Sequence, residues 1–209
     1  NEYFSPITKS IFEHQGTIDK YVGDMVMAFW GAPIKNPRHA EDAVIGGFDM
    51  LAITERLRKE FVEKDWPEVK VGIGINTGDM NVGDMGSEYR RSYTVLGDAV
   101  NLGSRLEGLT KFYGLEFLVS EFTKAQCPNI VFRPVDKVKV KGKDEAVAIF
   151  EPVCPKDQLD EITKQEIDDL NDAYDAYLSQ NWDDATHRYK KLLEQFPERY
   201  LYQLYLERI

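Results

Sequence analysis

The sequence predicts an α/β (α+β) fold, a sheet with helices packed on it, followed by an all-helical extension. Short β-rich runs alternate with amphipathic helical runs up to about residue 153. Beyond that point apolar residues recur only at helical spacing, and residues 156–209 contain thirteen acidic against seven basic side chains. This shift in pattern predicts two parts, a mixed domain over residues 1–153 and a helical tail over residues 154–209.

The first predicted elements are a helix and a hairpin. Residues 1–15 carry apolar side chains at helical spacing and are followed by Gly16, a residue suited to a helix C-terminus. Residues 17–22 and 25–30 are short β-rich runs separated by a Gly-Asp pair, which is typical of a tight turn. We therefore expect a β-hairpin with Asp24 at its tip.

Two longer helices and several strands follow. Asn36 is a suitable cap for a helix that begins at Pro37 and keeps one apolar face up to Ala52. A second amphipathic helix is expected over residues 98–113. Strands are expected at residues 69–77, 80–84, 89–95, 116–119, 130–140 and 145–151.

The tail has the apolar spacing of two helices and a shorter third. Five residues lie near the signature positions of a tetratricopeptide repeat, namely Ala173, Trp182, Ala185, Tyr189 and Pro197. A single repeat cannot bury its own apolar face, so we expect the tail to dock on the mixed domain, pair between two chains or begin a longer array. The plainer alternative is a packing extension without a partner.

Composition limits the partners. The formal net charge of −10 argues against nucleic acid, because phosphate backbones are bound through an excess of Lys and Arg. No apolar run reaches the roughly 18 residues of a membrane span, so we expect no membrane insertion by this chain. Cys127 and Cys154 lack a CxxC partner and indicate idle thiols in a reducing, cytoplasmic compartment. Domains ahead of the chain can still attach such a protein to a membrane.

The segment GTIDKYVGDMVMAFWGAP, Gly16 to Pro33, places an acidic residue at the predicted turn. It resembles the class III nucleotidyl cyclase family, in which a strand, a Gly-Asp turn and a second strand present a metal-binding carboxylate. The resemblance implies that Asp24 binds a divalent ion, and carboxylates are ligands that Mg²⁺ prefers. Without its surroundings Asp24 would be an ordinary hairpin aspartate.

The segment YTVLGDAVNLGSRLEGL, Tyr93 to Leu109, resembles the strand-to-helix element of the same family. Asn101 and Arg105 lie four residues apart and therefore share one helix face. The resemblance implies that this pair stabilises charge at the reacting phosphate and positions the ribose, where fixed donors are most effective. A surface amide and a solvated or salt-bridged arginine are the plainer alternatives.

Two further positions bear on the substrate base. Lys20 with Thr94 resembles the adenine-specific members of the family, whereas guanylyl cyclases usually carry Glu and Cys at these places. The resemblance implies ATP as substrate, because a hydrogen-bond pattern built for adenine leaves buried groups unpaired with guanine. Thr94, in place of the commoner Asp, also resembles the bicarbonate-responsive subgroup.

Two other segments have features that can indicate nucleotide binding. KVKVKGKDEAVAIF, Lys137 to Phe150, resembles the closing hairpin of the family, which lends a lysine to the triphosphate. We choose Lys141 over Lys143 for this role, with a charged, solvated edge strand as the plainer alternative. The glycine-rich run from Gly72 to Gly78 has the wrong spacing for a dinucleotide fingerprint and is expected to be a core strand.

In homodimeric members of this family each active site is composite, so the resemblance implies a homodimer in which Lys20 and Asp24 serve opposite sites. It also implies two divalent ions, Mg²⁺ or Mn²⁺, in a ferredoxin-like palm sheet with flanking helices. The family's first strand carries a second metal aspartate, in a segment like FTDIRGFT, before the helix at which this sequence begins. We expect that segment in the whole protein; the alternative is an inactive relative.

The function implied by the resemblance is metal-dependent conversion of ATP to 3′,5′-cyclic AMP and pyrophosphate, in bacterial-type signalling. One alternative is a guanylyl cyclase of the same class. Another is a catalytically silent nucleotide-sensing or scaffold module. A diguanylate cyclase is disfavoured, because no GGDEF-like segment occurs in the sequence.

Overall fold

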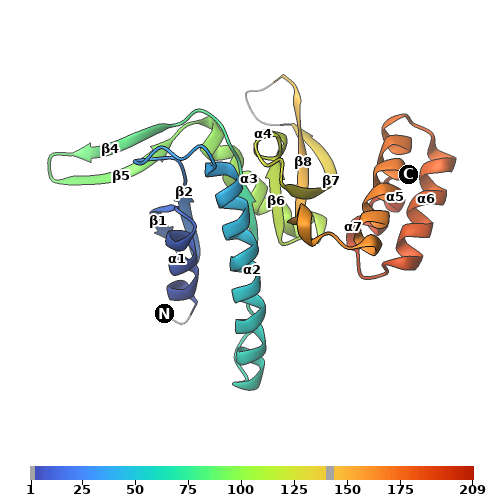
Figure 1. Ribbon diagram of the computed structural model, residues 1–209, viewed down its shortest axis with the longest axis horizontal. Helices are drawn as coiled ribbons and strands as arrows, with labels where there is room; N and C mark the ends of the chain where they lie inside the picture. The colour runs from blue at the N-terminus through green and yellow to red at the C-terminus, as the bar shows by residue number, and fades with distance from the viewer. Residues whose placement is uncertain (1–2, 140–143) are drawn as a thin grey trace.

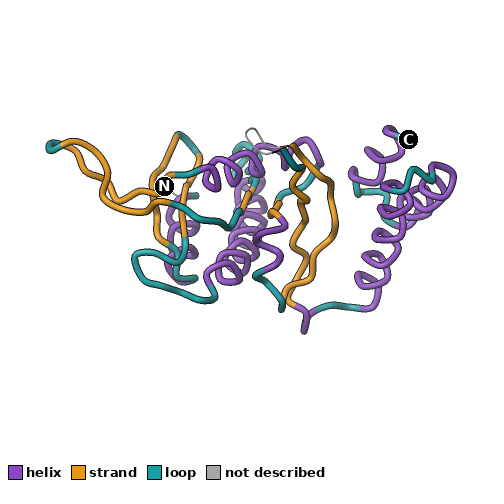
Figure 2. The backbone as a smooth tube through the Cα atoms, turned by 90° about the horizontal axis from the view of Figure 1, so that it is seen from above, coloured by secondary structure: helices purple, strands orange, loops and turns teal. Residues whose placement is uncertain are grey.

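The computed structural model describes residues 3–139 and 144–209. A long β-hairpin projects at one end, a sheet with helices on both faces lies in the middle, and the helical tail lies at the other end (Figures 1 and 2). The predicted α+β class with a C-terminal helical segment is therefore confirmed.

The N-terminal elements follow the expectation closely. Helix α1 (Phe4–Glu13) leads into strands β1 (Thr17–Val22) and β2 (Met25–Phe29), which pair antiparallel. Gly23 adopts a positive φ of 62° at the turn between them, a conformation that glycine adopts without strain. The register of β1 shifts between Ile18 and Lys20, so β1 contains a bulge at Asp19.

Helix α2 (His39–Glu63) differs from the prediction at both ends. It does not begin at Pro37, because Asn36 accepts a hydrogen bond from the Arg38 N–H at 2.9 Å and holds a turn there. It also continues beyond Ala52, and its buried apolar side extends to Leu57. Spaced ion pairs support these last turns: Lys59 with Glu55 at 3.9 Å, and Arg56 with Glu60 at 4.0 Å.

The central sheet has four strands in the order β3-β6-β8-β7. Strands β3 and β6 are parallel, and the other two pairs are antiparallel. The expected strand over residues 69–77 is much shorter in the structure. The bounds are β3 (Ile73–Ile75), β6 (Phe117–Ser120), β7 (Ile130–Lys139) and β8 (Ala146–Pro155).

Both faces of this sheet are covered. Phe117 and Val119 of β6 pack with Val44 of α2 on one face. Leu118, between them in sequence, packs on the other face with Leu106 of helix α3 (Asp98–Tyr113). Because successive strand residues point to opposite faces, β6 is buried along its whole length. A short helix that the sequence did not predict, α4 (Glu121–Ala125), follows β6 directly.

The projecting hairpin consists of β4 (Asn81–Ser87) and β5 (Arg90–Leu96), paired antiparallel over their full lengths. It extends away from the central sheet (Figure 1). Its tip is open to solvent, with Tyr89 96% exposed.

The tail forms the three expected helices, α5 (Glu161–Leu178), α6 (Trp182–Gln195) and α7 (Tyr200–Arg208), after a short 3₁₀ turn (Lys156–Gln158). Its apolar side chains join the hydrophobic core under β7 and β8. The tail members of this shared core are Leu170, Ala173, Tyr189, Leu192, Leu201, Tyr202, Leu204 and Tyr205. Of the three arrangements left open for the tail, the structure has the first, docking on the mixed domain.

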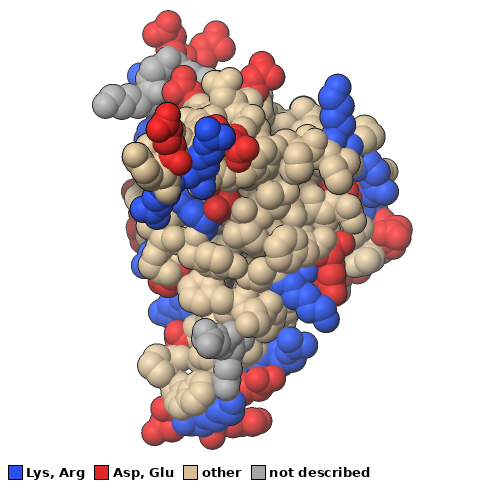
Figure 3. Space-filling model, turned by 90° about the vertical axis from the view of Figure 1, so that its left-hand side faces the viewer, with Lys and Arg blue, Asp and Glu red and all other residues tan. Residues whose placement is uncertain are grey.

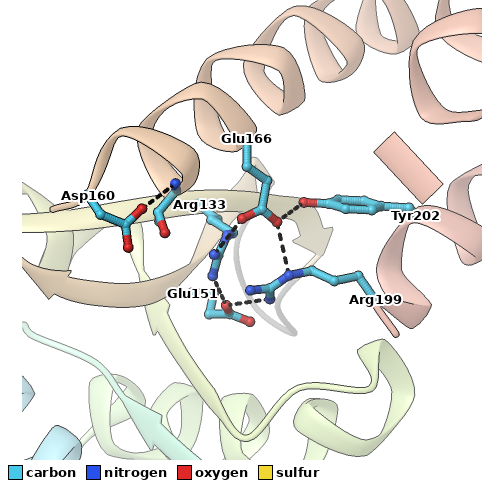
Figure 4. Close-up of polar contacts among 7 residues, drawn as sticks. Arg133, Glu151, Asp160, Glu166, Arg199 and Tyr202 are labelled. Carbon is cyan, nitrogen blue, oxygen red and sulfur yellow. Dashed lines mark hydrogen bonds and ion pairs between the residues drawn. The ribbon is translucent and has the colours of Figure 1, made fainter. Parts of the chain in front are cut away.

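A buried ionic network closes the junction between sheet and tail (Figure 4). Arg133 of β7 contacts Glu151 of β8 at 2.6 Å and Glu166 of α5 at 2.8 Å. Arg199, just before α7, lies 2.9 Å from Glu166 and 3.3 Å from Glu151. Tyr202 donates a hydrogen bond to Glu166. Two guanidinium groups are thus matched by two carboxylates across the interface.

Candidate active site

Lys20 and Thr94 lie together where the first hairpin meets β5. Both contact the carboxylate of Asp19: Thr94 Oγ1 donates to Oδ2 at 2.7 Å, and Lys20 Nζ lies 3.7 Å from Oδ1. The backbone N–H of Val95 donates to Oδ2 as well, at 3.1 Å. The structure therefore brings the two proposed base-selecting residues to one place, joined by a residue that the sequence analysis did not single out.

The two side-chain contacts of Asp19 differ in strength. Its side chain is only 2% exposed, and a hydrogen bond to a charged acceptor contributes about 1.5–3 kcal/mol. The Lys20 side chain is 49% exposed, and ion pairs of that kind contribute at most about 1 kcal/mol. Thr94 is thus held firmly, while the Lys20 ammonium can turn toward a ligand.

Asn101 and Arg105 lie on α3, which begins two residues after β5 ends. Both side chains are exposed, next to the buried Leu102 and Leu106 on the core side of the helix. Within the described residues, no hydrogen bond or ion pair occupies either side chain. The predicted shared face is confirmed, and its donors are available to a ligand.

The start of α3 is fixed to the sheet by Asn76. Its Nδ2 donates to the carbonyl of Ala99 at 2.8 Å, and its Oδ1 accepts from Ser120 of β6 at 2.6 Å. Close packing adds to this. A Cβ on Gly74 of β3 would lie 2.2 Å from the backbone nitrogen of Glu107, so only glycine allows α3 to lie this near to β3. The glycine-rich run serves helix packing, in agreement with the rejection of a dinucleotide fingerprint.

Asp24 lies at the tip of the first hairpin, exposed, as predicted. It contacts neither Lys20 nor Thr94, and within the described residues its carboxylate accepts no hydrogen bond. Burial of Tyr3 raises the pKa of its hydroxyl, and the nearby negative charge of Asp24 raises it further. In residues 3–139 and 144–209, no cluster of three or more His, Cys, Asp and Glu side chains could hold a metal ion.

An exposed single carboxylate nevertheless fits one part of a magnesium site. Mg²⁺ is usually bound through one or two carboxylates together with waters and substrate phosphates. Asp24 can supply one such ligand. Lys141, the predicted triphosphate ligand, and its alternative Lys143 lie outside the described residues.

The family model for the adenylate and guanylate cyclase catalytic domain matches residues 1–150. The chain belongs to this family. The match ends at β8, and residues 151–209, including the helical tail, lie beyond it.

Individual relatives agree with this assignment. This cyclase domain is 41% identical over 157 residues to adenylate cyclase 1 of Rhizobium meliloti, covering 73% of this chain and 23% of that protein. It is 32% identical over 214 residues to the terminal-differentiation specific adenylate cyclase of Dictyostelium discoideum, covering all of this chain, tail included, and 10% of that protein. The chain therefore spans less than a quarter of either relative.

Solved structures give the same fold. The crystal structure of the guanylyl cyclase Cya2 matches with a TM-score of 0.69 and 29% identity, over 77% of this chain and 81% of that one. The adenylyl cyclase CyaB from P. aeruginosa matches with a TM-score of 0.67 and 32% identity, over 77% of this chain and 83% of that one. In the described part of the cyclase domain and its tail, no helix has the length and apolar character to cross a membrane.

Asp19 is the site residue that sequence reasoning missed. In a regular strand, Asp19 and Lys20 would point to opposite faces, so nothing in the alternating pattern connects them. The bulge in β1 overrides the alternation. The only local signal was a charged residue inside a β-rich run directly before the proposed base-selecting lysine.

Proposed function

We propose that this cyclase domain converts ATP to 3′,5′-cyclic AMP and pyrophosphate, in bacterial-type signalling. The observation that carries the proposal is the meeting of Lys20 and Thr94 on one buried carboxylate, directly before the helix that bears Asn101 and Arg105. A donor and a hydroxyl side by side suit the edge of a purine base. The relatives named as adenylate cyclases support the choice of ATP.

The residues take separate roles in this proposal. Lys20 and Thr94 bind the base, and Arg105 and Asn101 donate to the ribose and to the phosphate at which charge develops as the 3′-hydroxyl attacks. Fixed donors at such a point each contribute about 3 kcal/mol to the transition state. Lys141 binds the triphosphate.

Asp24 would hold a divalent ion, Mg²⁺ or Mn²⁺, together with a second metal aspartate of the kind that the family's first strand carries. When bound, such ions neutralise the triphosphate and favour ionisation of the attacking hydroxyl. Two ions are proposed on the family resemblance and on the fit of an exposed carboxylate to this ligand chemistry.

We further propose a homodimer in which each site takes Asp24 from one chain and Lys20, Asn101 and Arg105 from the other. The exposed apolar side chains of the two hairpins support this arrangement, including Tyr21 at 50% and Leu96 at 51% exposure. The face at the β4–β5 end has a broad central area with few charged side chains (Figure 3). Such an area suits burial against a second copy.

Three finer points belong to the same proposal. The chain is proposed to belong to the Lys/Thr subgroup, which resembles the bicarbonate-responsive members of the family. The tail is proposed as a tetratricopeptide-like segment that the domain at residues 1–153 stabilises. A cytoplasmic location follows from the use of ATP as substrate.

The test is cyclic nucleotide production by the full-length native protein, with ATP or GTP and with Mg²⁺ or Mn²⁺, at several protein concentrations. We expect cyclic AMP, with specific activity rising as the protein is concentrated, because each site needs two chains. An absence of product from either nucleotide, in a folded dimer with both metals, would refute the proposal in favour of a silent nucleotide-sensing or scaffold module.

A guanylyl cyclase is the second candidate, since Cya2 carries that name and is 29% identical. Competition between ATP and GTP in the same assay separates the two. Cyclic GMP as the main product would establish the second candidate.

A further inference from the structure

A single buried carboxylate lies between the two side chains proposed to select the base. Asp19 Oδ2 accepts hydrogen bonds from the Thr94 hydroxyl and the Val95 N–H, at 2.7 and 3.1 Å. Its Oδ1 faces the Lys20 ammonium at 3.7 Å. Because the Asp19 side chain is 2% exposed, these three groups replace the water that a carboxylate would otherwise bind.

These contacts determine which donors and acceptors of Thr94 and Lys20 remain available to a ligand. A backbone N–H can only donate, so Oδ2 of Asp19 is an acceptor, and the single hydroxyl proton of Thr94 is donated to it. The Thr94 oxygen keeps only its lone pairs. Lys20 has three N–H donors and no acceptor, and those turned away from Asp19 remain available. The pair therefore presents an acceptor beside a donor.

We infer that Asp19 is a positioning residue that makes the Thr94–Lys20 pair selective for adenine, an inference that rests on the proposed function. Adenine offers its N6 amino group as a donor beside N1 as an acceptor; guanine offers O6 as an acceptor beside the N1–H donor. The fixed pair matches adenine at both atoms and opposes guanine at both. Without Asp19, the Thr94 hydroxyl rotates freely and can donate to guanine O6.

The bulge in β1 makes this arrangement possible. The register shift between Ile18 and Lys20 leaves Asp19 as the extra residue of the strand, and bulges re-aim side chains in this way. Asp19 reaches across from the first hairpin to β5, to partners 75 and 76 positions away in the sequence. A purely structural role, tying the two hairpins together, is the competing explanation, and it predicts no change in base preference.

The experiment measures kcat/KM for ATP and for GTP in the full-length protein and three variants, Asp19→Ala, Thr94→Val and the double variant. We expect Asp19→Ala to lower the ATP-to-GTP ratio at least about tenfold, by releasing a hydrogen bond to a charged group. The ATP-to-GTP ratio of the double variant should be no lower than that of Thr94→Val alone, because the effects of substitutions at coupled residues are not additive.

The matched control is Asp49→Ala. Asp49 accepts a hydrogen bond from the Ser10 hydroxyl at 2.6 Å, between α1 and α2. The Asp49→Ala substitution therefore removes the same kind of contact at a place away from the base-selecting pair. We expect the ATP-to-GTP ratio of Asp49→Ala to equal that of the wild type. An Asp19→Ala protein that loses activity equally with both nucleotides, at an unchanged ratio, overturns the inference.

Asp19→Asn decides the matter if Asp19→Ala does not fold. The amide keeps an acceptor for Thr94 and Val95 but places a donor toward Lys20, so the ratio should fall by about threefold, as for loss of a half-exposed ion pair. An unchanged ratio in this folded variant overturns the inference.

Competition binding of ATP and GTP separates this inference from the proposed function. A wild-type protein that prefers ATP in binding but forms no product refutes the cyclase proposal alone, and the binding ratios of the variants then test Asp19. Equal binding of both nucleotides by a wild-type protein that forms cyclic AMP overturns the role of Asp19 alone.

Discussion

Loss of the Glu166 charge should destabilise the whole protein, because this carboxylate lies at the centre of the junction between sheet and tail. Glu166 is 2% exposed and faces two guanidinium groups, Arg133 at 2.8 Å and Arg199 at 2.9 Å. It also accepts the hydroxyl hydrogen bond of Tyr202. In Glu166→Gln, the buried Arg133 and the partly exposed Arg199 share the one remaining carboxylate of Glu151.

The magnitude follows from this geometry. Removing one partner of a buried ion pair costs about 3–5 kcal/mol, and the amide keeps one acceptor, so we expect about 3 kcal/mol. For a chain of this size, each kcal/mol lowers the Tm by roughly 2–4 °C, which gives roughly 6–12 °C. Because tail and sheet share one core, the loss should appear in one cooperative transition.

The assay is urea and thermal unfolding, followed by far-UV circular dichroism and tyrosine fluorescence. The control is Asp168→Asn, the same carboxylate-to-amide change on the exposed side of α5. A Glu166→Gln protein no less stable than the control would refute the reasoning. A separate early transition of the tail would refute the claim of a shared core.

Three other predictions test the site and the core. Asn101→Ala and Arg105→Ala should each lower kcat by roughly a hundredfold or more, because both side chains donate hydrogen bonds to the transition state. The Tm of each variant should stay unchanged, because both side chains are exposed. A wild-type rate in either variant would show that the residue does not belong to the site. Gly74→Ala should lower both the Tm and the activity, because the new Cβ would lie 2.2 Å from a backbone nitrogen of α3. Thermal unfolding and product formation measure the two effects. Unchanged values would show that α3 can move away from β3 without loss of stability or activity. Burial, and secondarily a nearby carboxylate, raises the pKa of the Cys127 thiol from 9.0 to about 12. A thiol reagent at pH 8 should therefore label Cys154 first and Cys127 only after unfolding. Because the thiol ionises more readily in the unfolded chain, its contribution to the stability of the folded state is present below pH 9 and is lost as the pH rises toward 12.

Local signals in the sequence were enough for the elements that carry the site. Helix α3 runs from Asp98 to Tyr113, the predicted range, because glycines with positive φ stand at both ends, Gly97 at 147° and Gly114 at 64°. The hairpin with Asp24 at its tip was likewise predictable from the Gly-Asp pair and the flanking β-rich runs. Asn101 and Arg105 share a face because helical spacing alone requires it.

The ends of the helices and the position of the tail were harder to predict from the sequence. The helix expected to begin at Pro37 begins at His39, since the Asn36 side chain closes a turn with the next residues. The apolar faces of the tail predicted helices but left three arrangements open. Docking on the sheet was decided by contacts such as Arg133 with Glu166, which no local periodicity encodes.

By itself the sequence determined the α+β class, the helical tail, the cyclase motifs and the placement of Asp24, Asn101 and Arg105 on their elements. Only the tertiary structure decided that Thr94 and Lys20 meet on Asp19, which a bulge makes the extra residue of its strand. The physical reason is separation along the chain. Periodicity and turn chemistry act over a few residues, whereas the Asp19–Thr94 hydrogen bond joins residues 75 positions apart and forms only when both hairpins have folded against each other.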